Sequence, residues 1–325
     1  MTKVGIIGGA GYTAGELIRL LVNHPMVELD FVYSTSNAGN LISEVHSDLY
    51  GDLDLKFSNK INPEVAVLFL CLGHGNSKAF LEQHDFSSST VIIDLSNDFR
   101  LKNDAEFQGR KFVYGLPEFQ KSAIVKANAI ANPGCFATDI QLGLLPLASL
   151  GLLNNDVHIN ATTGATGAGV SPGATTHFAW RDNNFSVYKA FNHQHLGEIG
   201  ETLETFDSKN TGELMFIPNR GNFSRGIFAS MYTKFEGSLD KAYQMYEAYY
   251  AEEPFVHISH KPIHLKQVVN TNKCLIHLEK HGDQLVIYSV IDNLLKGASG
   301  QAVQNMNLIF GWEETTGLKL KANNF

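Results

Sequence analysis

Long apolar runs separated by short polar breaks dominate the first third of the chain. The four runs, each of which ends in small or polar residues, cover residues 3–8, 28–34, 65–71 and 90–96. Continuous apolar runs of this length are typical of parallel strands that are covered on both faces. After the first run, Leu17, Leu20 and Leu21 share one face of a predicted helix. The pattern therefore predicts a doubly wound parallel sheet of the Rossmann type.

Beyond Pro146, apolar and polar positions alternate more regularly. The alternating segments are VHINATTG, ELMFIPN, RGIFASMYTKF, CLIHLEK and QLVIYSVID, and the last two flank a His-Gly-Asp turn at residues 281–283. Such alternation predicts half-buried strands, here of a mostly antiparallel sheet. One helix, over residues 239–253, is expected to cross this sheet.

These two patterns divide the chain into two expected domains. A chain of 325 residues is longer than one hydrophobic core usually organises. Near the C-terminus, a predicted helix over about 298–310 aligns apolar residues on one face for packing against the first domain. We therefore place an α/β domain at residues 1–134, completed by the C-terminal helix within 297–325, and an α+β domain at 135–296.

Composition and charge narrow the classes of partner. Hydrophobic residues make up 44% of the chain and charged residues 18%, and the net charge is −8. A negative chain without a basic patch has little attraction for nucleic acid or anionic lipid. The opening MTKVGIIGG leads directly into a strand without a cleavable apolar segment, and no run reaches membrane-spanning length. We expect a cytoplasmic protein without nucleic-acid or membrane partners.

A glycine-rich turn follows the first predicted strand. The stretch GIIGGAGYTAG fits the pattern Gly-x-Gly-x-x-Gly/Ala at Gly9, Gly11 and Ala14, directly before the predicted helix. Glycines let the backbone turn tightly and approach a pyrophosphate, whose charge is met by the amides at the helix N-terminus. A tight turn without a ligand is the alternative, but the strand and helix on either side favour dinucleotide binding.

The end of the second predicted strand bears on the choice between NAD and NADP. An acidic residue at this point would hold the ribose hydroxyls of NAD, but Asp30 lies too early, within the strand. The strand instead ends in YSTSN, where Ser34, Thr35 and Ser36 can donate to a 2′-phosphate without repelling it. NADP is therefore the expected cofactor, although no arginine stands there to hold the phosphate.

Cys135 is the candidate nucleophile. It follows a Pro-Gly turn at the expected start of a helix, where backbone amides and the helix dipole favour the thiolate. The three cysteines are too few and too scattered for a disulfide framework or a cysteine-rich zinc site. Cys71 and Cys274 are expected to pack as small apolar residues, which is also the alternative for Cys135.

A histidine pair is the candidate acid/base. In FNHQHLGEIGE, His193 and His195 precede a predicted helix that includes Glu198, and a cysteine nucleophile needs such a base. The pair could also begin a metal site, but no further His or Cys with suitable spacing follows, so no metal is expected. A thiolate that adds to an acyl carbon, followed by hydride reduction of the thioester, accounts for the cysteine and the dinucleotide signal together.

Seven segments, in order, resemble the N-acetyl-gamma-glutamyl-phosphate reductase family of the semialdehyde dehydrogenase group. They are GGAGYTAGEL at Gly8, IDLSNDFRL at Ile93, YGLPE at Tyr114, NPGCFAT at Asn132, NHQHLGEI at Asn192, SRGI at Ser224 and KGASGQAVQNMNL at Lys296. The resemblance implies a glyceraldehyde-3-phosphate dehydrogenase-like fold. It also implies NADPH-dependent reduction of N-acyl-gamma-glutamyl phosphate, with N-acetyl as the first choice, in arginine biosynthesis.

The resemblance further implies residue roles. Cys135 would attack the acyl phosphate to form a thioester, and either His193 or His195 would be the acid/base. With the turn and the strand end, the expected cofactor-binding set is Gly8, Gly11, Tyr12, Thr13, Ser34, Ser36, His74, Gly75, Gly164 and Asn293. Arg100 and Arg225 would hold the phosphate or carboxylate of the substrate, and a structural ion pair is the equal alternative for each.

Two positions depart from the family pattern. Asp139 stands one helical turn after the cysteine, where the family usually has Gly or Ala. Its carboxylate could complement the helix dipole, or oppose the thiolate if it points inward. Val170 stands where the family often has arginine, so a different acyl group on the glutamate nitrogen, such as succinyl, is an alternative.

Two other readings of the chain compete with this one. Aspartate-semialdehyde dehydrogenase shares the cofactor fold and the cysteine chemistry, although GYTAGEL and NHQH fit it less well. A non-catalytic NADP-binding sensor, in which Cys135 only packs, represents a different class. In each case the second sheet needs its exposed face or edge covered, so a homodimer or homotetramer is expected.

Overall fold

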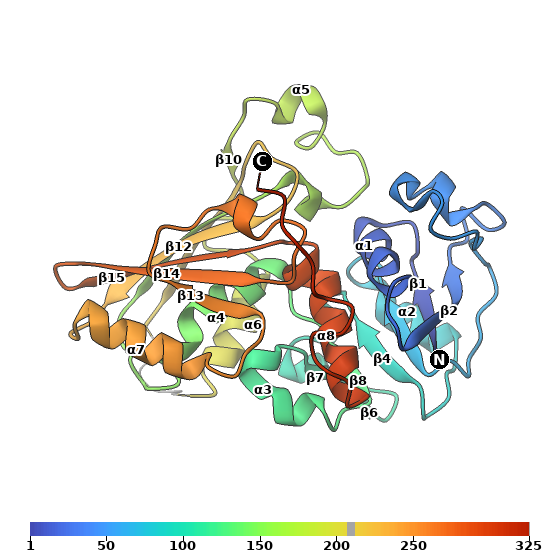
Figure 1. Cartoon of the computed structure of the whole chain (residues 1–325), viewed down its shortest axis with the longest axis horizontal. Coiled ribbons are helices and arrows are strands. Elements are labelled where there is room, and N and C mark those ends of the chain that lie inside the picture. The colour runs from blue at the N-terminus through green and yellow to red at the C-terminus, as the bar shows by residue number, and fades with distance from the viewer. Residues whose placement is uncertain (207–211, 325) are drawn as a thin grey trace. The chain divides into compact units, whose positions relative to one another are not determined.

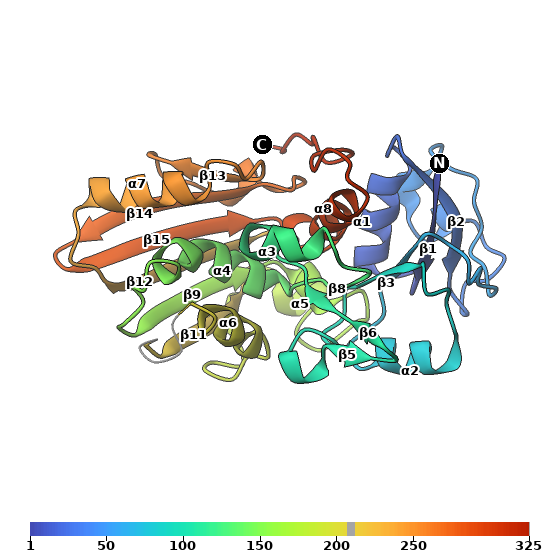
Figure 2. The same cartoon turned by 90° about the horizontal axis from the view of Figure 1, so that it is seen from below.

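The computed structural model describes residues 1–206 and 212–324, which form two compact units (Figures 1 and 2). The first unit contains Met1–Pro133 and Ala298–Lys319. The second contains Gly134–Gly297, together with the described residues after Lys319. Within the described part of the chain, no helix is both long and apolar enough to cross a membrane.

A six-stranded sheet, parallel throughout, forms the centre of the first unit. Its strand order is β2-β1-β3-β4-β8-β7. The bounds are β1 (Thr2–Ile7), β2 (Val27–Tyr33), β3 (Val67–Leu70), β4 (Val91–Asp94), β7 (Val113–Tyr114) and β8 (Ala129–Ala131). The four strands predicted from apolar runs are β1 to β4, so the Rossmann-type sheet is confirmed. β2 and β3 lie on opposite sides of β1, so the strand order reverses at β1. In open α/β sheets, ligands bind at the carboxyl ends of the strands beside such a reversal.

The first unit also contains helices and a short hairpin. The helices are α1 (Tyr12–Leu21), α2 (Asn76–Gln83), α3 (Pro117–Ile124) and α8 (Gly300–Ile309), and β5 (Glu106–Phe107) with β6 (Arg110–Lys111) makes the hairpin. The predicted apolar face of α1 is buried, as are Val303 and Met306 of α8. α8 packs against α1 and α3, so the C-terminal helix completes the core of this unit (Figure 2).

The second unit is a seven-stranded sheet in the order β10-β11-β9-β12-β15-β14-β13. The bounds are β9 (Val157–Thr163), β10 (Ser186–Val187), β11 (Leu214–Arg220), β12 (Ile227–Lys234), β13 (Val256–Ser259), β14 (Cys274–His281) and β15 (Gln284–Ile291). The predicted antiparallel character is confirmed except that β9 with β11, and β13 with β14, pair in parallel. Its helices are α4 (Cys135–Ala148), α5 (Phe178–Arg181), α6 (His195–Leu203) and α7 (Leu239–Tyr249).

α4 is the central helix of the second unit. It lies on one face of the sheet between α6 and α7 (Figure 2), and every residue from Phe136 to Ala148 is buried. Pro146 has no N–H to pair with the carbonyl of Leu142, and the hydroxyl of Tyr250 donates to that carbonyl instead, at 2.5 Å. A proline inside a buried helix is therefore compatible with complete pairing at this carbonyl.

Asp139 is buried within α4 and faces β15. Its Oδ1 accepts a hydrogen bond of 2.5 Å from the hydroxyl of Ser289, whereas Oδ2 has no hydrogen-bond partner. Complete burial raises the pKa of Asp139 to about 8, and the Ser289 bond lowers it only in part. The carboxyl group is therefore mainly uncharged at neutral pH, and it neither complements the helix dipole nor opposes a thiolate by its charge.

The burial of Asp139 predicts a pH-dependent cost to stability. An unfolded aspartate has a pKa of about 3.9, so between about pH 4 and 8 the folded state holds a proton that the unfolded state has lost. The contribution of this group to the free energy of unfolding therefore falls as pH rises through that window, by up to about 1.4 kcal/mol per pH unit. Asp139→Asn cannot ionise, so it should gain stability relative to wild type between pH 5 and pH 8 in urea unfolding. A difference between the two proteins that does not change with pH contradicts this account.

Candidate active site

Cys135 is the first residue of α4, as the sequence predicts. Gly134 forms the N-cap with extended backbone angles, and the first turn of the helix contains no acidic residue. Cys135 is half-buried, in contrast to the thirteen residues that follow it in the helix. A thiol at this place meets the positive end of the helix dipole, which favours its thiolate form.

Gly297 holds the backbone close against this cysteine. A Cβ added at Gly297 would lie 2.8 Å from the Cβ of Cys135 and 3.2 Å from its Cα, closer than carbon atoms normally approach. The amide of Gly297 donates to the carbonyl of Asp292, which fixes the approaching segment. The second unit therefore leaves room only for glycine opposite the candidate nucleophile.

The two candidate histidines lie at the start of α6, beside the start of α4. His193 and His195 are only 6% and 5% exposed, and their ring centroids are 4.6 Å apart. Both rings pack edge-on near Phe136, the residue after Cys135, with centroid distances of 5.4 and 6.3 Å. The structure thus brings together the nucleophile and the acid/base pair that the sequence nominated.

The two histidines differ in their surroundings. The Nδ1 of His193 accepts a hydrogen bond of 3.2 Å from the amide of His195, which assigns the proton of the neutral ring to Nε2. Burial, and then the charge of Lys189, lower the pKa of His193 to about 4, although Glu198 opposes them. His193 is therefore neutral at physiological pH.

Glu198 connects the two helix starts. One oxygen of its carboxylate accepts a hydrogen bond of 2.9 Å from the amide of Gly134, and the other lies 3.9 Å from Nε2 of His195. The carboxylate is thus placed to attract positive charge on His195 while it fixes the residue before Cys135. The role of Glu198 was not predicted from the sequence, although its spacing of three from His195 places both residues on one helix face.

Tyr188 and Arg220 are site residues that the sequence reasoning missed. The ring of Tyr188 lies 5.8 Å from that of His193, and the guanidinium carbon of Arg220 lies 4.7 Å above the Tyr188 ring. Burial, and then the negative charge of Cys135, raise the pKa of Tyr188 to about 12. The phenol of Tyr188 is therefore close enough to Cys135 to interact with a thiolate there. Neither residue belongs to a periodic segment, so the hydrophobic pattern contained no signal for them.

Gly164 and Asn293 lie in one hydrogen-bonded cluster of the second unit. The amide of Gly226 donates to Asn293 Oδ1 at 2.7 Å, and Asn293 Nδ2 donates to Thr166 Oγ1 at 3.1 Å. A Cβ at Gly164 would stand only 2.4 Å from the carbonyl oxygen of Ser224. The cluster fixes the backbone around both nominated residues.

The two nominated substrate arginines are engaged within the fold. Arg225 makes two hydrogen bonds, of 3.1 and 3.2 Å, to the carboxylate oxygens of Asp292, which is fully buried. Arg100, in the first unit, donates to the carbonyls of Asn132 and Leu95 at 2.9 and 3.0 Å. Arg225 thus takes part in an ion pair within the second unit, and both arginines are held in place by the fold.

The glycine turn of the first unit fits a pyrophosphate. Gly8 has φ of 81°, and a Cβ there would lie 2.6 Å from the carbonyl oxygen of Cys71. Gly11 is the N-cap of α1, where Tyr12 and Thr13 begin the helix without a side-chain cap or an acidic residue in the first turn. The exposed amides of this helix start are the chemistry that a diphosphate needs.

The other nominated cofactor residues lie at the carboxyl ends of β2 and β3. After β2, the Nδ2 group of Asn37 donates to Ser34 at 3.3 Å and to Ser36 at 3.0 Å, so hydroxyl and amide groups gather there without an acid. After β3, Gly75 adopts φ of 82° as the N-cap of α2, and the Nδ1 of His74 accepts from the amide of Asn97. Asp30 pairs with Lys3 at 3.0 Å within the strands, in agreement with its exclusion as a ribose ligand.

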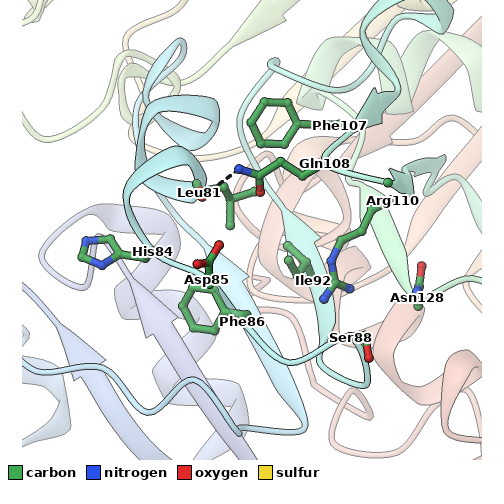
Figure 3. Close-up of a pocket in the computed structure, with 11 residues that line it drawn as sticks. Leu81, His84, Asp85, Phe86, Ser88, Ile92, Phe107, Gln108, Arg110 and Asn128 are labelled. Carbon is green, nitrogen blue, oxygen red and sulfur yellow. Dashed lines mark hydrogen bonds between the residues drawn. The ribbon is translucent and has the colours of Figure 1, made fainter.

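A separate pocket of about 420 Å³ opens in the first unit, between the end of α2 and the β5–β6 hairpin (Figure 3). Gln108 closes one side by donating to the carbonyl of Leu81 at 3.2 Å. The guanidinium of Arg110 donates to the carbonyls of Thr90 and Ser87, which ties it to neighbouring backbone. None of the nominated residues lines this pocket, and among the described residues no three His, Cys, Asp or Glu side chains gather as metal ligands.

Comparisons with known proteins find relatives along nearly the whole chain. The family model described as semialdehyde dehydrogenase, NAD binding domain, matches residues 3–127, and that described as semialdehyde dehydrogenase, dimerisation domain, matches 135–293. The N-acetyl-gamma-glutamyl-phosphate reductases of Flavobacterium johnsoniae and Christiangramia forsetii are 62% and 61% identical, and each match covers 100% of both chains. Aspartate semialdehyde dehydrogenase II from Vibrio cholerae, complexed with ASA, matches with a TM-score of 0.72 at 16% identity, over 96% of this chain and 98% of that one. This last likeness shows the fold alone.

The close approach of Gly297 predicts the effect of one added methyl group. Gly297→Ala should displace Cys135 from the start of α4 and raise the pKa of its thiol, and each unit of increase slows alkylation at neutral pH about tenfold. The measurement is the rate of iodoacetamide labelling at pH 7, read on the Cys135 peptide by mass spectrometry. Gly200→Ala in α6 is the matched control, because its Cβ meets no atom within 4 Å. Equal labelling rates in the two variants contradict the role assigned to Gly297.

Proposed function

The chain belongs to the semialdehyde dehydrogenase family, and we propose that it reduces N-acyl-gamma-glutamyl phosphate to the N-acyl-glutamate 5-semialdehyde with NADPH. We take N-acetyl as the acyl group and arginine biosynthesis as the setting, because the full-length relatives are named N-acetyl-gamma-glutamyl-phosphate reductase. The observation on which the proposal depends is the placement of Cys135 at the start of a buried helix, beside two histidines.

The Cys135 thiolate attacks the acyl carbon of the substrate, and the bond from that carbon to the phosphate oxygen breaks. Phosphate leaves with the electron pair, and a thioester on Cys135 remains. A nicotinamide cofactor, when bound, supplies the hydride that reduces this thioester carbonyl. The histidine pair then protonates the resulting oxyanion, and collapse of the thiohemiacetal releases the semialdehyde and regenerates the thiol.

Most of the residues proposed to hold the cofactor belong to the first unit. Gly8, Gly11, Tyr12 and Thr13 fit its diphosphate, since a side chain at Gly8 would close the turn and the α1 amides have no competing acid. Hydroxyl groups without an acid at the end of β2 support NADP over NAD. His74 and Gly75 of the first unit, and Gly164 and Asn293 of the second, are the further proposed cofactor residues. Arg100 and Arg225 remain the proposed substrate contacts.

Three alternatives are kept apart by experiment. The N-succinyl substrate differs only in the acyl group, and aspartyl phosphate differs in the whole acyl chain. A non-catalytic NADP-binding sensor would retain the cofactor fold with a Cys135 that reacts as an ordinary thiol. We place the protein in the cytoplasm as a homodimer or homotetramer, a proposal supported by the match to a family model described as a dimerisation domain.

The reaction is tested in reverse, which avoids the unstable acyl phosphate. Wild-type protein should reduce NADP in the presence of N-acetylglutamate 5-semialdehyde and phosphate, and Cys135→Ala should lose this activity because no thioester can form. The measurement is phosphate-dependent NADPH absorbance. Wild type that is silent with the N-acetyl, N-succinyl and aspartate semialdehydes would establish the sensor reading. Activity with only one of the last two would assign that substrate instead.

Ser36 provides the test of cofactor choice. The side chain is exposed at the end of β2, so Ser36→Asp should fold normally while its charge repels a 2′-phosphate and accepts from ribose hydroxyls. We expect kcat/KM for NADP to fall about 10- to 100-fold, equal to about 1.4 to 2.8 kcal/mol, while that for NAD holds or rises. Ser36→Asn is the uncharged control of the same shape. If the two variants behave alike, the serine cluster does not read the phosphate.

A further inference from the structure

We propose that Arg220, supported by Arg181, binds a carboxylate of the acyl-glutamate substrate, an inference that rests on the proposed function. Arg220 is the last residue of β11 and Arg181 the last residue of α5, both within the second unit. Neither residue was singled out by its sequence context.

The two guanidinium groups lack acidic partners. Among the described residues, no carboxylate lies within ion-pair distance of Arg181 or Arg220, and the Nε of each is buried without a hydrogen-bond partner. Arg181 is only 5% exposed, and burial, followed by the charge of Arg220, lowers its pKa. Two neighbouring cations, of which one is buried and the other half-buried, are costly without an acidic partner, and an anionic ligand would offset that cost.

Arg181 is already positioned, whereas Arg220 is available. The Nη1 of Arg181 donates to the backbone carbonyl of Arg220 at 3.2 Å, and both terminal nitrogens reach the hydroxyl of Ser186 at 3.2 to 3.3 Å. Arg181 therefore fixes the backbone at the end of β11. Arg220 stacks on Tyr188 and shares a side-chain hydrogen bond with it, but it has no acidic partner among the described residues, and its Nε is buried without a hydrogen-bond partner. We therefore take Arg220 as the substrate-binding residue and Arg181 as its positioning residue.

Arg220 lies beside the proposed catalytic residues. Its guanidinium stacks on Tyr188, whose ring in turn lies against His193 and within the electrostatic field of Cys135. Arg225 lies near Arg220 in the sequence, but its charge is neutralised by the ion pair with Asp292. Of these two, only Arg220 lacks a carboxylate partner among the described residues, so its charge and its remaining planar donors suit an anionic group.

A carboxylate matches this pair of donors, and the substrate offers two sources. The glutamate α-carboxylate is present whatever the acyl group, whereas an N-succinyl group would add a second carboxylate. The phosphate is a third anion, but it is lost during the reaction, and a contact with it would affect a different kinetic constant.

The test compares Arg220→Gln and Arg220→Lys with wild type in the reverse assay. A lost charged bidentate contact should raise KM for the semialdehyde about 10- to 100-fold in Arg220→Gln, with little change in kcat or in KM for phosphate and NADP. Arg220→Lys keeps the positive charge but not the two parallel N–H donors of the guanidinium, so its KM for the semialdehyde should lie between those of wild type and Arg220→Gln. Arg19→Gln, which removes a half-exposed arginine paired with Glu16 in the first unit, is the control for loss of an arginine.

Two arms assign the source of the carboxylate. An equal loss with N-acetyl- and N-succinylglutamate semialdehydes identifies the α-carboxylate, and a loss confined to the N-succinyl compound identifies the acyl carboxylate. A rise in KM for phosphate alone, or no change in any KM, overturns the proposal. A parallel binding measurement separates this inference from the proposed function. N-acetylglutamate and N-succinylglutamate are tested for protection of Cys135 from iodoacetamide in wild type and in Arg220→Gln, and this readout does not require turnover.

In the binding measurement, either compound should protect Cys135 in wild type. Loss of this protection in Arg220→Gln, with partial recovery in Arg220→Lys, supports the site even if the chain catalyses no reduction. Equal protection in wild type and Arg220→Gln overturns it even if the reductase activity is present. Circular dichroism melting of each variant confirms that the compared proteins are folded.

Discussion

Complete burial of α4 is the constraint on which the second unit depends. The helix lies on the sheet between α6 and α7, so its direction and its starting point are fixed by packing on all sides. Only Cys135, at its N-terminal end, escapes full burial. The core thereby sets the position of the Cys135 sulfur, because close-packed protein interiors resist displacement of their elements. Gly297 and Glu198 add close backbone contact and a hydrogen bond at the same helix end.

Environment distinguishes the three thiols of the chain. Burial, with the charge of Asp94, raises the pKa of Cys71 to about 12, and Cys274 is fully buried against the hydroxyl of Ser289. Neither position favours a thiolate. Cys135 has the helix start, the neutral His193 and the His195–Glu198 pair beside it. The same side chain thus acts as a packing residue at two positions and as the proposed nucleophile at the third.

Local signals account for what could be predicted from the sequence. The apolar runs of β1 to β4, the glycine turn and the Pro-Gly turn before Cys135 each reflect neighbours along the chain. Strands of two or three residues, such as β7 and β8, are too short to show a pattern. Two contacts join residues that are distant in sequence, so composition and spacing could not predict them. They are the ion pair of Arg225 with Asp292 and the stacking of Arg220 on Tyr188. Asp139 is an unusual residue at its position in the sequence, but its orientation toward Ser289 depends on the packing of α4 on β15.

The central claim is that Cys135 forms a thioester with the acyl group, and mass spectrometry tests it most directly. Protein mixed with N-acetylglutamate 5-semialdehyde and NADP, but without phosphate, should form NADPH and accumulate the acyl adduct on the Cys135 peptide. Addition of phosphate should then remove the adduct, because phosphate attacks the thioester carbonyl and returns the free thiol. An adduct on any other residue, or phosphate-dependent turnover with Cys135 alkylated throughout, would contradict the account.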